Sequence, residues 1–187
     1  MKTSQVRIIG GDWRGRKLEF PATAQQLRPT PGRIRETLFN WLSYDIKGAR
    51  CLDLYAGSGA LGAEALSRGA AEVTFVESDR TSSRLLEQNL DRLGRPSRVY
   101  TMDARRFLRQ VDGTWDIVFL DPPYRHGMLQ QIIGLLHAHQ RLAEKALIYM
   151  EAERELGAIK LPPGWHYLKQ KKAGQIEYFL VTNNQEG

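Results

Sequence analysis

The sequence predicts an α/β fold, a mostly parallel sheet with helices on both faces, preceded by a β-hairpin and a helix. From Arg50 onward, short apolar runs rich in β-branched and aromatic residues alternate with helical patterns, which is typical of βαβ units. Near the C-terminus this alternation stops. There "GWHYLKQKKAG" and "QIEYFLVTN" indicate two strands joined by a tight turn at Ala173 and Gly174, so an antiparallel strand is expected beside the parallel ones.

The first element expected along the chain is a hairpin near the N-terminus. The runs "VRIIGG" and "GRKLEF" flank a glycine-rich turn that has Trp13 and Arg14 at its tip. Because this part of the chain lies outside the strand–helix alternation, we divide the protein into an N-terminal extension, residues 1–44, and a main domain, residues 45–187.

A helix is expected next, within "RPTPGRIRETLFNWL". Thr30 is placed to act as its N-cap, with Pro31 at the first helical position. Apolar residues then recur with the spacing of one helix face, at Ile34, Leu38, Trp41 and Leu42. We expect this face to pack on the main domain, and Arg33 and Arg35 to remain solvated.

The main domain continues with regular alternation. The expected strands are "CLDLY", "EVTFVES", "SRVYTM", "WDIVFLD" and "KALIYMEA". The expected helices between them are "SGALGAEALSRG", "TSSRLLEQNLDRLG", "ARRFLRQV" and "MLQQIIGLLHAHQ". Each strand is short and each helix connects it to the next, as a parallel sheet requires.

Composition indicates a globular protein of the cytoplasm. Hydrophobic residues make up 42% of the chain and charged residues 26%, and no apolar run approaches the roughly 20 residues that span a bilayer. The N-terminus has no apolar signal sequence, and the single cysteine, Cys51, suits a reducing compartment. We expect neither a membrane contact nor a metal site, and we expect a monomer.

The positive charge is unevenly distributed. The net charge is +6; residues 1–50 hold ten Lys and Arg against four Asp and Glu, whereas residues 51–187 hold seventeen of each. All of the excess therefore lies in the first quarter of the chain, which indicates a contact with nucleic acid or another anionic surface. A solvated basic face without a partner is the alternative, and composition does not separate the two.

A glycine-rich loop follows the strand "CLDLY". In "DLYAGSGALG", Gly57, Gly59 and Gly62 form a G-x-G-x-x-G pattern between a strand and a helix, which allows a tight turn and a close approach of a ligand to the backbone. Two cofactor classes fit this loop. One is a dinucleotide, whose pyrophosphate would lie at the helix N-terminus, and the other is S-adenosylmethionine, which has no phosphate.

Three acidic residues at strand ends favour S-adenosylmethionine. Asp53 would repel a pyrophosphate but attract the ammonium group of the methionine part, Glu77 is placed for ribose hydroxyls, and Asp103 for the adenine amine. Alternatives remain for two of them: Asp103 as a helix cap and Glu77 as a solvated strand end. Asp53 lies within a buried strand, where an unpaired carboxylate is costly.

The stretch "FLDPPY" suggests the second half of the site. Proline has no N–H group, so Pro122 and Pro123 leave carbonyl acceptors without competing donors beside the Asp121 carboxylate. Such an arrangement suits an exocyclic amine with two N–H donors, and Tyr124 is placed to stack on the base that carries it. The alternative is a strand end followed by a turn.

These motifs resemble those of class I S-adenosylmethionine-dependent methyltransferases, and "DPPY" resembles the [DNS]-P-P-[YFW] signature of the amino-methylating members. "RIIGGDWRGRKL" and "LRPTPGRIRETLFNWL" resemble the RsmD-type bacterial enzymes, which modify N2 of one guanine in small-subunit rRNA. The resemblance covers nearly the whole chain. It implies a Rossmann-like, seven-stranded sheet with an antiparallel last strand, and it implies S-adenosylmethionine as cofactor.

The resemblance also implies site residues. The residues expected at the cofactor are Arg28, Thr30, Asp53, Tyr55, Gly57, Gly59, Glu77, Ser78, Asp103, Ala104 and Asp121. Those expected at the amine are Asp121, Pro122, Pro123 and Tyr124. Those expected to contact RNA are Arg7, Trp13, Arg14, Arg16, Lys17, Arg33 and Asn40.

The expected substrate is small-subunit rRNA, either naked or within a partly assembled ribosomal subunit. The proline motif would serve any planar amine, so a DNA adenine or protein glutamine methyltransferase is an alternative. A non-catalytic RNA-binding assembly factor with the same fold is another, and a nicotinamide-dependent enzyme is the weakest.

Overall fold

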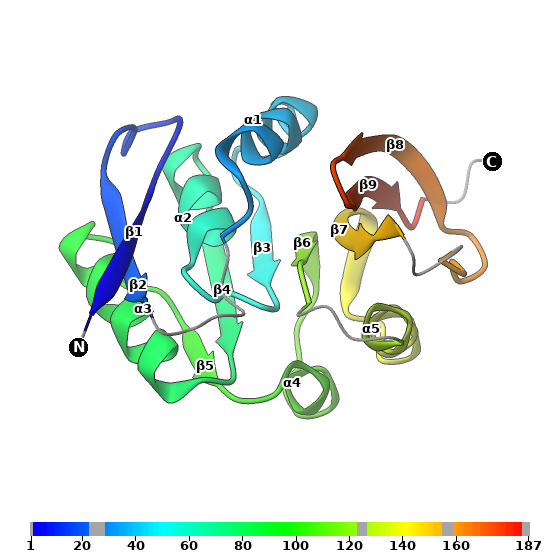
Figure 1. The fold of residues 1–187 in the computed structure, drawn as a ribbon. Helices are drawn as coiled ribbons and strands as arrows, with labels where there is room; N and C mark the ends of the chain where they lie inside the picture. Colours follow the sequence, from blue (N-terminus) through cyan, green and yellow to red (C-terminus); the bar gives the residue numbers. More distant parts are fainter. Residues whose placement is uncertain (1, 23–28, 123–126, 155–158, 185–187) are drawn as a thin grey trace.

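The central element is a seven-stranded sheet (Figure 1). The computed structural model describes residues 2–22, 29–122, 127–154 and 159–184. The strand order is β5-β4-β3-β6-β7-β9-β8. The strands are β3 (Arg50–Asp53), β4 (Glu72–Glu77), β5 (Val99–Thr101), β6 (Trp115–Leu120), β7 (Leu142–Glu153), β8 (His166–Ala173) and β9 (Ile176–Thr182). Neighbours from β5 to β7 are parallel, and β9 is antiparallel to both β7 and β8, which confirms the predicted fold class.

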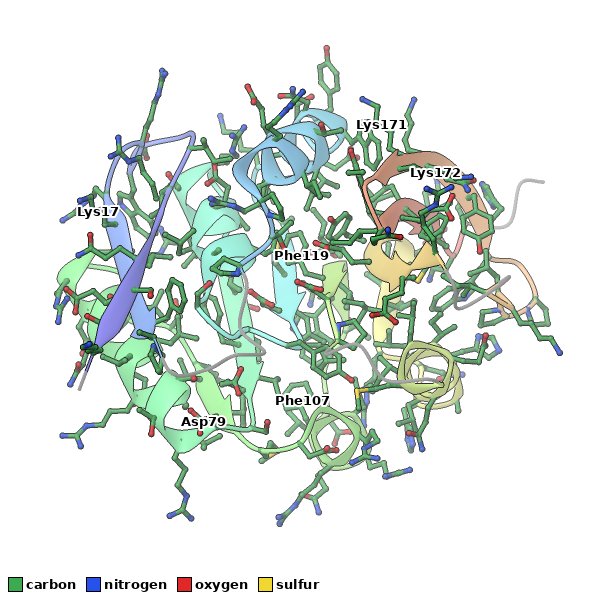
Figure 2. The ribbon with its side chains drawn as sticks, in the orientation of Figure 1. Lys17, Asp79, Phe107, Phe119, Lys171 and Lys172 are labelled. Carbon is green, nitrogen blue, oxygen red and sulfur yellow. The ribbon has the colours of Figure 1, made fainter. Side chains whose placement is uncertain are left out.

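Helices cover both faces of this sheet. They are α1 (Gly32–Trp41), α2 (Ala60–Ser67), α3 (Arg80–Arg92), α4 (Ala104–Gln110) and α5 (Met128–Ala138). Phe119 of β6 belongs to the core beneath α1, α2 and α3, whereas its neighbour Val118 belongs to the core beneath α4 and α5. Figure 2 labels Phe119 and Phe107 of α4. This alternation along β6 is what a strand buried on both faces requires.

The N-terminal hairpin packs against α2 and α3. Strands β1 (Thr3–Arg7) and β2 (Lys17–Pro21) pair antiparallel, and Ile8 and Leu18 are buried against Ala63 and Leu93. On the outer side of β2, Asn89 of α3 accepts from the Glu19 amide at 3.1 Å and donates to the Glu19 carbonyl at 2.7 Å. The Asn89 side chain thus pairs with the backbone N–H and C=O of Glu19 on the unpaired edge of β2, as a residue of a further strand would.

The loop of the hairpin is held by α2. Trp13 donates its amide to Ser67 Oγ at 2.9 Å, and Ser67 Oγ donates to the Gly10 carbonyl at 2.6 Å. Gly11 has a φ of +72°, and a Cβ there would overlap the Ser67 carbonyl oxygen, so glycine is required by the close approach. The Trp13 ring is half-buried against the core and does not stand free at the tip of the turn.

Two expectations about α1 are wrong. Pro31 occupies the N-cap position without a side-chain cap, because the Thr30 hydroxyl bonds instead to the carboxyl groups of Asp121, after β6, and Glu151 of β7. Arg35 is buried, with 4% exposed surface, and not solvated. Its Nε donates to the Thr30 carbonyl at 3.1 Å and its Nη2 to the Arg7 carbonyl at 2.9 Å, so it joins the hairpin to the start of α1.

The C-terminal hairpin is one residue out of the predicted position. Ala173 pairs with Ile176, so the turn consists of Gly174 and Gln175, and Gly174 has a φ of +60°. Within the described part of the chain, no helix combines the length and apolar character needed to cross a bilayer. The same residues contain no group of three potential metal ligands from His, Cys, Asp and Glu.

Candidate functional site

The candidate site lies where the carboxyl ends of the parallel strands meet. From β3 the chain passes to β4 and β5 on one side, and then returns to β6 on the other side of β3. Ligands of open α/β sheets bind at this switch point. Asp53 ends β3, Glu77 ends β4 and Asp121 follows β6, so the fold brings these three predicted residues to one edge.

The glycine loop connects β3 to α2 at this edge. Gly57 and Gly59 have φ values of +50° and +74°, in the region that favours glycine. Gly59 packs so closely on Leu86 that a Cβ would overlap that side chain, and Gly62 packs in the same way on the Phe75 ring. The first two glycines therefore shape the loop, and Gly62 allows α2 to approach the sheet.

Glu77 accepts hydrogen bonds from the backbone of the glycine loop, and Asp53 accepts one from the first turn of α2. Glu77 Oε2 accepts from the Gly57 amide at 2.8 Å and Oε1 from the Asp79 amide at 2.7 Å. Asp53 Oδ2 accepts from the Gly62 amide at 2.9 Å. A carboxylate oxygen accepts more than one hydrogen bond, so both side chains retain acceptor capacity for a ligand. The chemistry of these donor and acceptor groups fits the ribose and ammonium groups of S-adenosylmethionine.

Burial sets the protonation of Asp53. It raises the pKa of this carboxyl to about 7, the negative charge of Glu77 adds to the increase, and the Gly62 amide opposes it. A cationic ligand beside Asp53, such as the ammonium group of S-adenosylmethionine, would favour the ionised form of this carboxyl group.

Asp103 has a structural task in this protein. Its Oδ1 accepts from the amides of Arg105 and Arg106 and so caps α4, and the Arg105 guanidinium binds both oxygens at 2.9 and 2.8 Å. The Arg105 hydrogen bonds lower the pKa of Asp103. The helix-cap alternative therefore describes its contacts, although its side chain is 45% exposed and its oxygens are accessible.

The remaining cofactor positions lie in loops at the same edge. Tyr55 is half-buried in the glycine loop, Ser78 is exposed after β4, and Ala104 is buried at the start of α4. Burial raises the pKa of Tyr55, with a further contribution from Asp103. Arg28 lies outside the described residues.

The Asp121 carboxyl is in contact with the segment before α1. Thr30 Oγ1 lies 3.2 Å from Asp121 Oδ2 and 2.8 Å from Glu151 Oε1, and the Tyr149 hydroxyl donates to the same Glu151 oxygen at 2.8 Å. Pro122 is buried directly after Asp121. Pro123 and Tyr124 lie outside the described residues.

Sequence reasoning missed Glu151 and Tyr149. The signal was present, since "KALIYMEA" places an acid in an apolar strand, and Glu151 is 3% exposed. Burial raises the pKa of Asp121 well above its usual range and the charge of Glu151 adds to this; burial also raises the pKa of Glu151. The site thus contains two neighbouring carboxyl groups, of which Glu151 is buried and Asp121 half-buried.

The predicted RNA contacts divide into two groups. Arg7, Arg14, Arg16 and Lys17 are exposed on the hairpin, where Figure 2 labels Lys17, and Arg16 also donates to the Arg92 carbonyl at 3.1 Å. Arg33 and Asn40 are exposed on α1. The structure therefore keeps these six side chains accessible, whereas Trp13 is partly covered.

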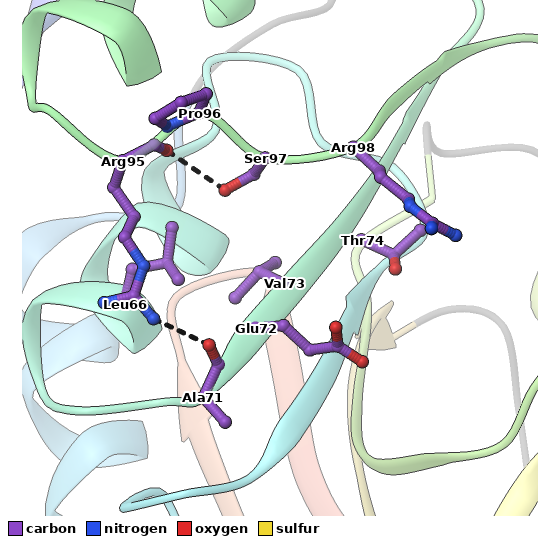
Figure 3. A pocket seen from close by; sticks show the side chains of 9 residues that line it. All are labelled: Leu66, Ala71, Glu72, Val73, Thr74, Arg95, Pro96, Ser97 and Arg98. Carbon is purple, nitrogen blue, oxygen red and sulfur yellow. Dashed lines mark hydrogen bonds between the residues drawn. The ribbon is translucent and has the colours of Figure 1, made fainter.

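One surface hollow lies away from this site. It has a volume of about 170 Å³ and is bordered by Glu72 and Thr74 of β4 and by Arg95 and Arg98, which precede β5 (Figure 3). Arg95 donates to the Ala71 carbonyl at 2.6 Å across it. Because these residues begin their strands, the hollow lies at the opposite edge of the sheet from Asp53, Glu77 and Asp121.

Comparisons with known proteins agree with this geometry. Residues 6–182 match the family described as Conserved hypothetical protein 95. The chain is 49% identical to the ribosomal RNA small subunit methyltransferase D of Escherichia coli K12 over 186 residues, which are 99% of this chain and 93% of that one. The solved structure of the Escherichia coli yhhF protein superposes with a TM-score of 0.90 at 47% identity, covering 97% of this chain and 99% of that one.

A more distant structure shares the fold. It is a 16S rRNA N2 G1207 methyltransferase of Thermus thermophilus in complex with AdoMet and guanosine, at a TM-score of 0.70 and 22% identity, covering 98% of this chain and 50% of that one. The matched length, the sheet order and the glycine loop lead to one conclusion. This chain belongs to the Conserved hypothetical protein 95 family, and its identity to ribosomal RNA small subunit methyltransferase D shows that it is a methyltransferase.

Proposed function

We propose that this protein transfers a methyl group from S-adenosylmethionine to the exocyclic N2 amine of a guanine in bacterial small-subunit rRNA. The observation that carries the proposal is the place of Asp121, a half-buried acceptor directly before a proline at the switch point of the sheet. The close relative that methylates small-subunit rRNA supports the substrate class.

The cofactor half of the site is the glycine loop with its two acids. Glu77 holds the loop at Gly57 and is placed to accept from the ribose, and Asp53 is placed to receive the ammonium group. Bound S-adenosylmethionine supplies the methyl group and leaves as S-adenosylhomocysteine. Asp103 and Ala104 border the same edge, where we propose that they receive the adenine ring.

The amine half consists of acceptors. A guanine amine is a weak nucleophile because its lone pair is conjugated with the ring. The Asp121 carboxylate accepts one of its hydrogens, and a carbonyl of the proline segment, which lacks N–H donors, accepts the other. These bonds orient the lone pair toward the methyl group, and orientation of this kind is a large part of catalysis. Pro123 and Tyr124 remain predictions for the same half.

The hairpin is proposed as the RNA-binding extension. Its exposed cations, Arg7, Arg14, Arg16 and Lys17, are suited to phosphates, and the base must leave its stack to reach a site at the strand ends. The hairpin is fixed to α2 and α3 by buried contacts, so it presents these cations in a defined orientation. Affinity for RNA should therefore decrease with salt.

The test is to map N2-methylated guanines in small-subunit rRNA from cells with and without this protein, and to restore the gene. We expect one modified guanine to be lost and then recovered. In parallel, transfer of tritiated methyl to purified rRNA, partly assembled subunits, DNA and protein is measured. Transfer to DNA or protein and not to rRNA would refute the proposed substrate, and no binding of S-adenosylmethionine by calorimetry would refute an enzymatic role.

A further inference from the structure

Behind Asp121 lies a buried chain of hydroxyl and carboxyl groups that reaches into β7. Thr30 lies between Asp121 and Glu151, and Tyr149 donates to Glu151 from the far side. Thr30, Glu151 and Tyr149 are each at most 4% exposed. Asp121 itself is half-buried. Solvent therefore screens Glu151 poorly and the contact between the two carboxyl groups only in part, and their hydrogen bonds decide which one is the more stable anion.

The hydroxyl hydrogens in this chain of groups favour Glu151 over Asp121 as the ionised carboxyl group. Thr30 and Tyr149 carry one hydroxyl hydrogen each, and both lie 2.8 Å from Glu151 Oε1, whereas Thr30 is 3.2 Å from Asp121 Oδ2. With both hydrogens directed at Glu151, Thr30 turns a lone pair toward Asp121. An ionised Asp121 is repelled by that lone pair, whereas a protonated Asp121 donates to it.

The charged and titratable groups around the two acids preserve this preference for an ionised Glu151 and a protonated Asp121. Among the described residues, Asp53 adds negative charge near Asp121, and Tyr178 of β9 is opposite Glu151 in the sheet. The Arg35 guanidinium bonds to the carbonyls of Thr30 and Arg7 and lies beside Glu64. The hydrogen bonds from Tyr149 and Thr30 counteract the rise that burial causes in the pKa of Glu151. Burial and the Glu151 charge raise the pKa of Asp121, and each outweighs the lowering by a Thr30 hydroxyl that donates to Asp121.

We propose that Glu151, acting through Thr30, makes Asp121 the acceptor of the proton that the methylated amine loses; this inference rests on the proposed function. After the amine nitrogen has bonded to the methyl carbon, it carries a positive charge. One N–H bond then breaks, its electron pair stays on nitrogen, and the proton forms an O–H bond with Asp121 that donates to Thr30. Glu151 remains ionised, and it is a positioning residue because it acts on Asp121 and not on the amine.

The decisive variant is Glu151→Gln. The glutamine carbonyl oxygen still accepts from Thr30 and Tyr149, but the negative charge is gone, so Asp121 becomes a weaker base. Activity requires ionised Asp121, so it rises with pH as this group loses its proton. In E151Q this rise should move to lower pH by about one unit. The plateau of kcat at high pH should fall roughly tenfold, while the KM for RNA should not change. If the activity of E151Q rises at the same pH as that of the wild type, the inference is overturned, because a purely structural role of Glu151 predicts no shift.

Thr30 gives a second, independent test. Thr30→Val keeps the shape of the side chain but removes the acceptor for the Asp121 proton, so the pH profile should shift in the same direction as in E151Q. Thr30→Ser restores the hydroxyl and should restore the wild-type profile. If T30V has the wild-type profile, Thr30 does not connect the two acids and the inference fails.

A measurement without RNA separates this inference from the proposed function. Infrared spectroscopy follows the carboxyl band of protonated Asp121, identified by its loss in Asp121→Asn, while the free protein is titrated. We expect the band to disappear at lower pH in E151Q than in the wild type. An unchanged titration refutes the coupling even if the enzyme methylates guanine, whereas a shifted titration upholds the coupling even if the substrate is another amine.

Discussion

Two sites in this protein, a single acid and a pair of acids, differ in the groups that surround their carboxyl oxygens. Glu64 of α2 is fully buried and accepts from the amides of Ile9 and Gly10 at 2.8 Å, and from Arg68 Nε at 2.8 Å, with Arg35 Nη1 at 3.5 Å. In the pair of Asp121 and Glu151, Glu151 is buried and Asp121 half-buried, and the contacts described for the pair are with the hydroxyl groups of Thr30 and Tyr149.

The difference separates a structural acid from a reactive one. Glu64 has two cations and two amides, so its charge is stabilised and it fastens the hairpin to α2. Asp121 has no comparable stabilisation in the described part of the chain, so its affinity for a proton is high, and burial raises its pKa. The same side-chain chemistry thus serves assembly in one region and, in the reaction that we propose, proton transfer in the other.

The largest effect is expected from Asp121→Ala. Methyl transfer to rRNA should fall by roughly 10²- to 10⁴-fold, because the amine loses its acceptor, while calorimetry should still detect S-adenosylmethionine binding. Asp45→Ala is the matched control, since this residue is exposed in the turn after α1. Loss of cofactor binding in D121A would mean that Asp121 belongs to the cofactor site instead.

Glu64→Ala should act on stability. It leaves the buried Arg35 guanidinium without its partner, and the free energy of unfolding should fall by about 3–5 kcal/mol in urea titrations. Arg35→Met together with Glu64→Ala removes both charges, so the double variant should be less destabilised than the sum of the single variants. Strict additivity in this cycle would contradict the role of Glu64 as the partner of Arg35.

Asp53 should make stability depend on pH. Its pKa is raised from 3.8 to about 7 in the folded protein, so the folded state holds this proton more tightly than the unfolded state. The resulting stability is complete below about pH 4 and is lost as the pH rises through about 7. Asp53→Asn should reduce that loss by up to a few kcal/mol, measured as unfolding free energies at about pH 5 and about pH 8. An equal pH dependence in both proteins would contradict the raised pKa.

The smallest effect is expected from Tyr149→Phe. It removes one of the two hydrogen bonds to Glu151, so kcat should decrease by no more than about fivefold, in line with a net hydrogen-bond contribution of about 1 kcal/mol. Tyr167→Phe on exposed β8 is the control. A loss as large as that of D121A would indicate that Tyr149 contacts the reacting groups.

Local patterns of the sequence determined most of the fold and half of the site. The alternation of apolar runs and helical patterns predicted the sheet and its helices, because those periods are properties of neighbouring residues. The positions of Gly57, Gly59, Asp53 and Glu77 followed from the spacing of one strand–loop–helix unit, and Asp121 from the prolines after β6.

Only the tertiary structure decided which distant groups meet. Thr30 satisfied every local rule for an N-cap, yet its hydroxyl bonds to Asp121 and Glu151, which are 91 and 121 residues away. Arg35 fell on the polar side of a helical pattern, yet the docked hairpin buries it against Glu64 and the Arg7 carbonyl. Sequence periodicity describes one element at a time, whereas these contacts depend on how β7, the hairpin and α1 pack together, and that is why the acid pair became visible only in the folded chain.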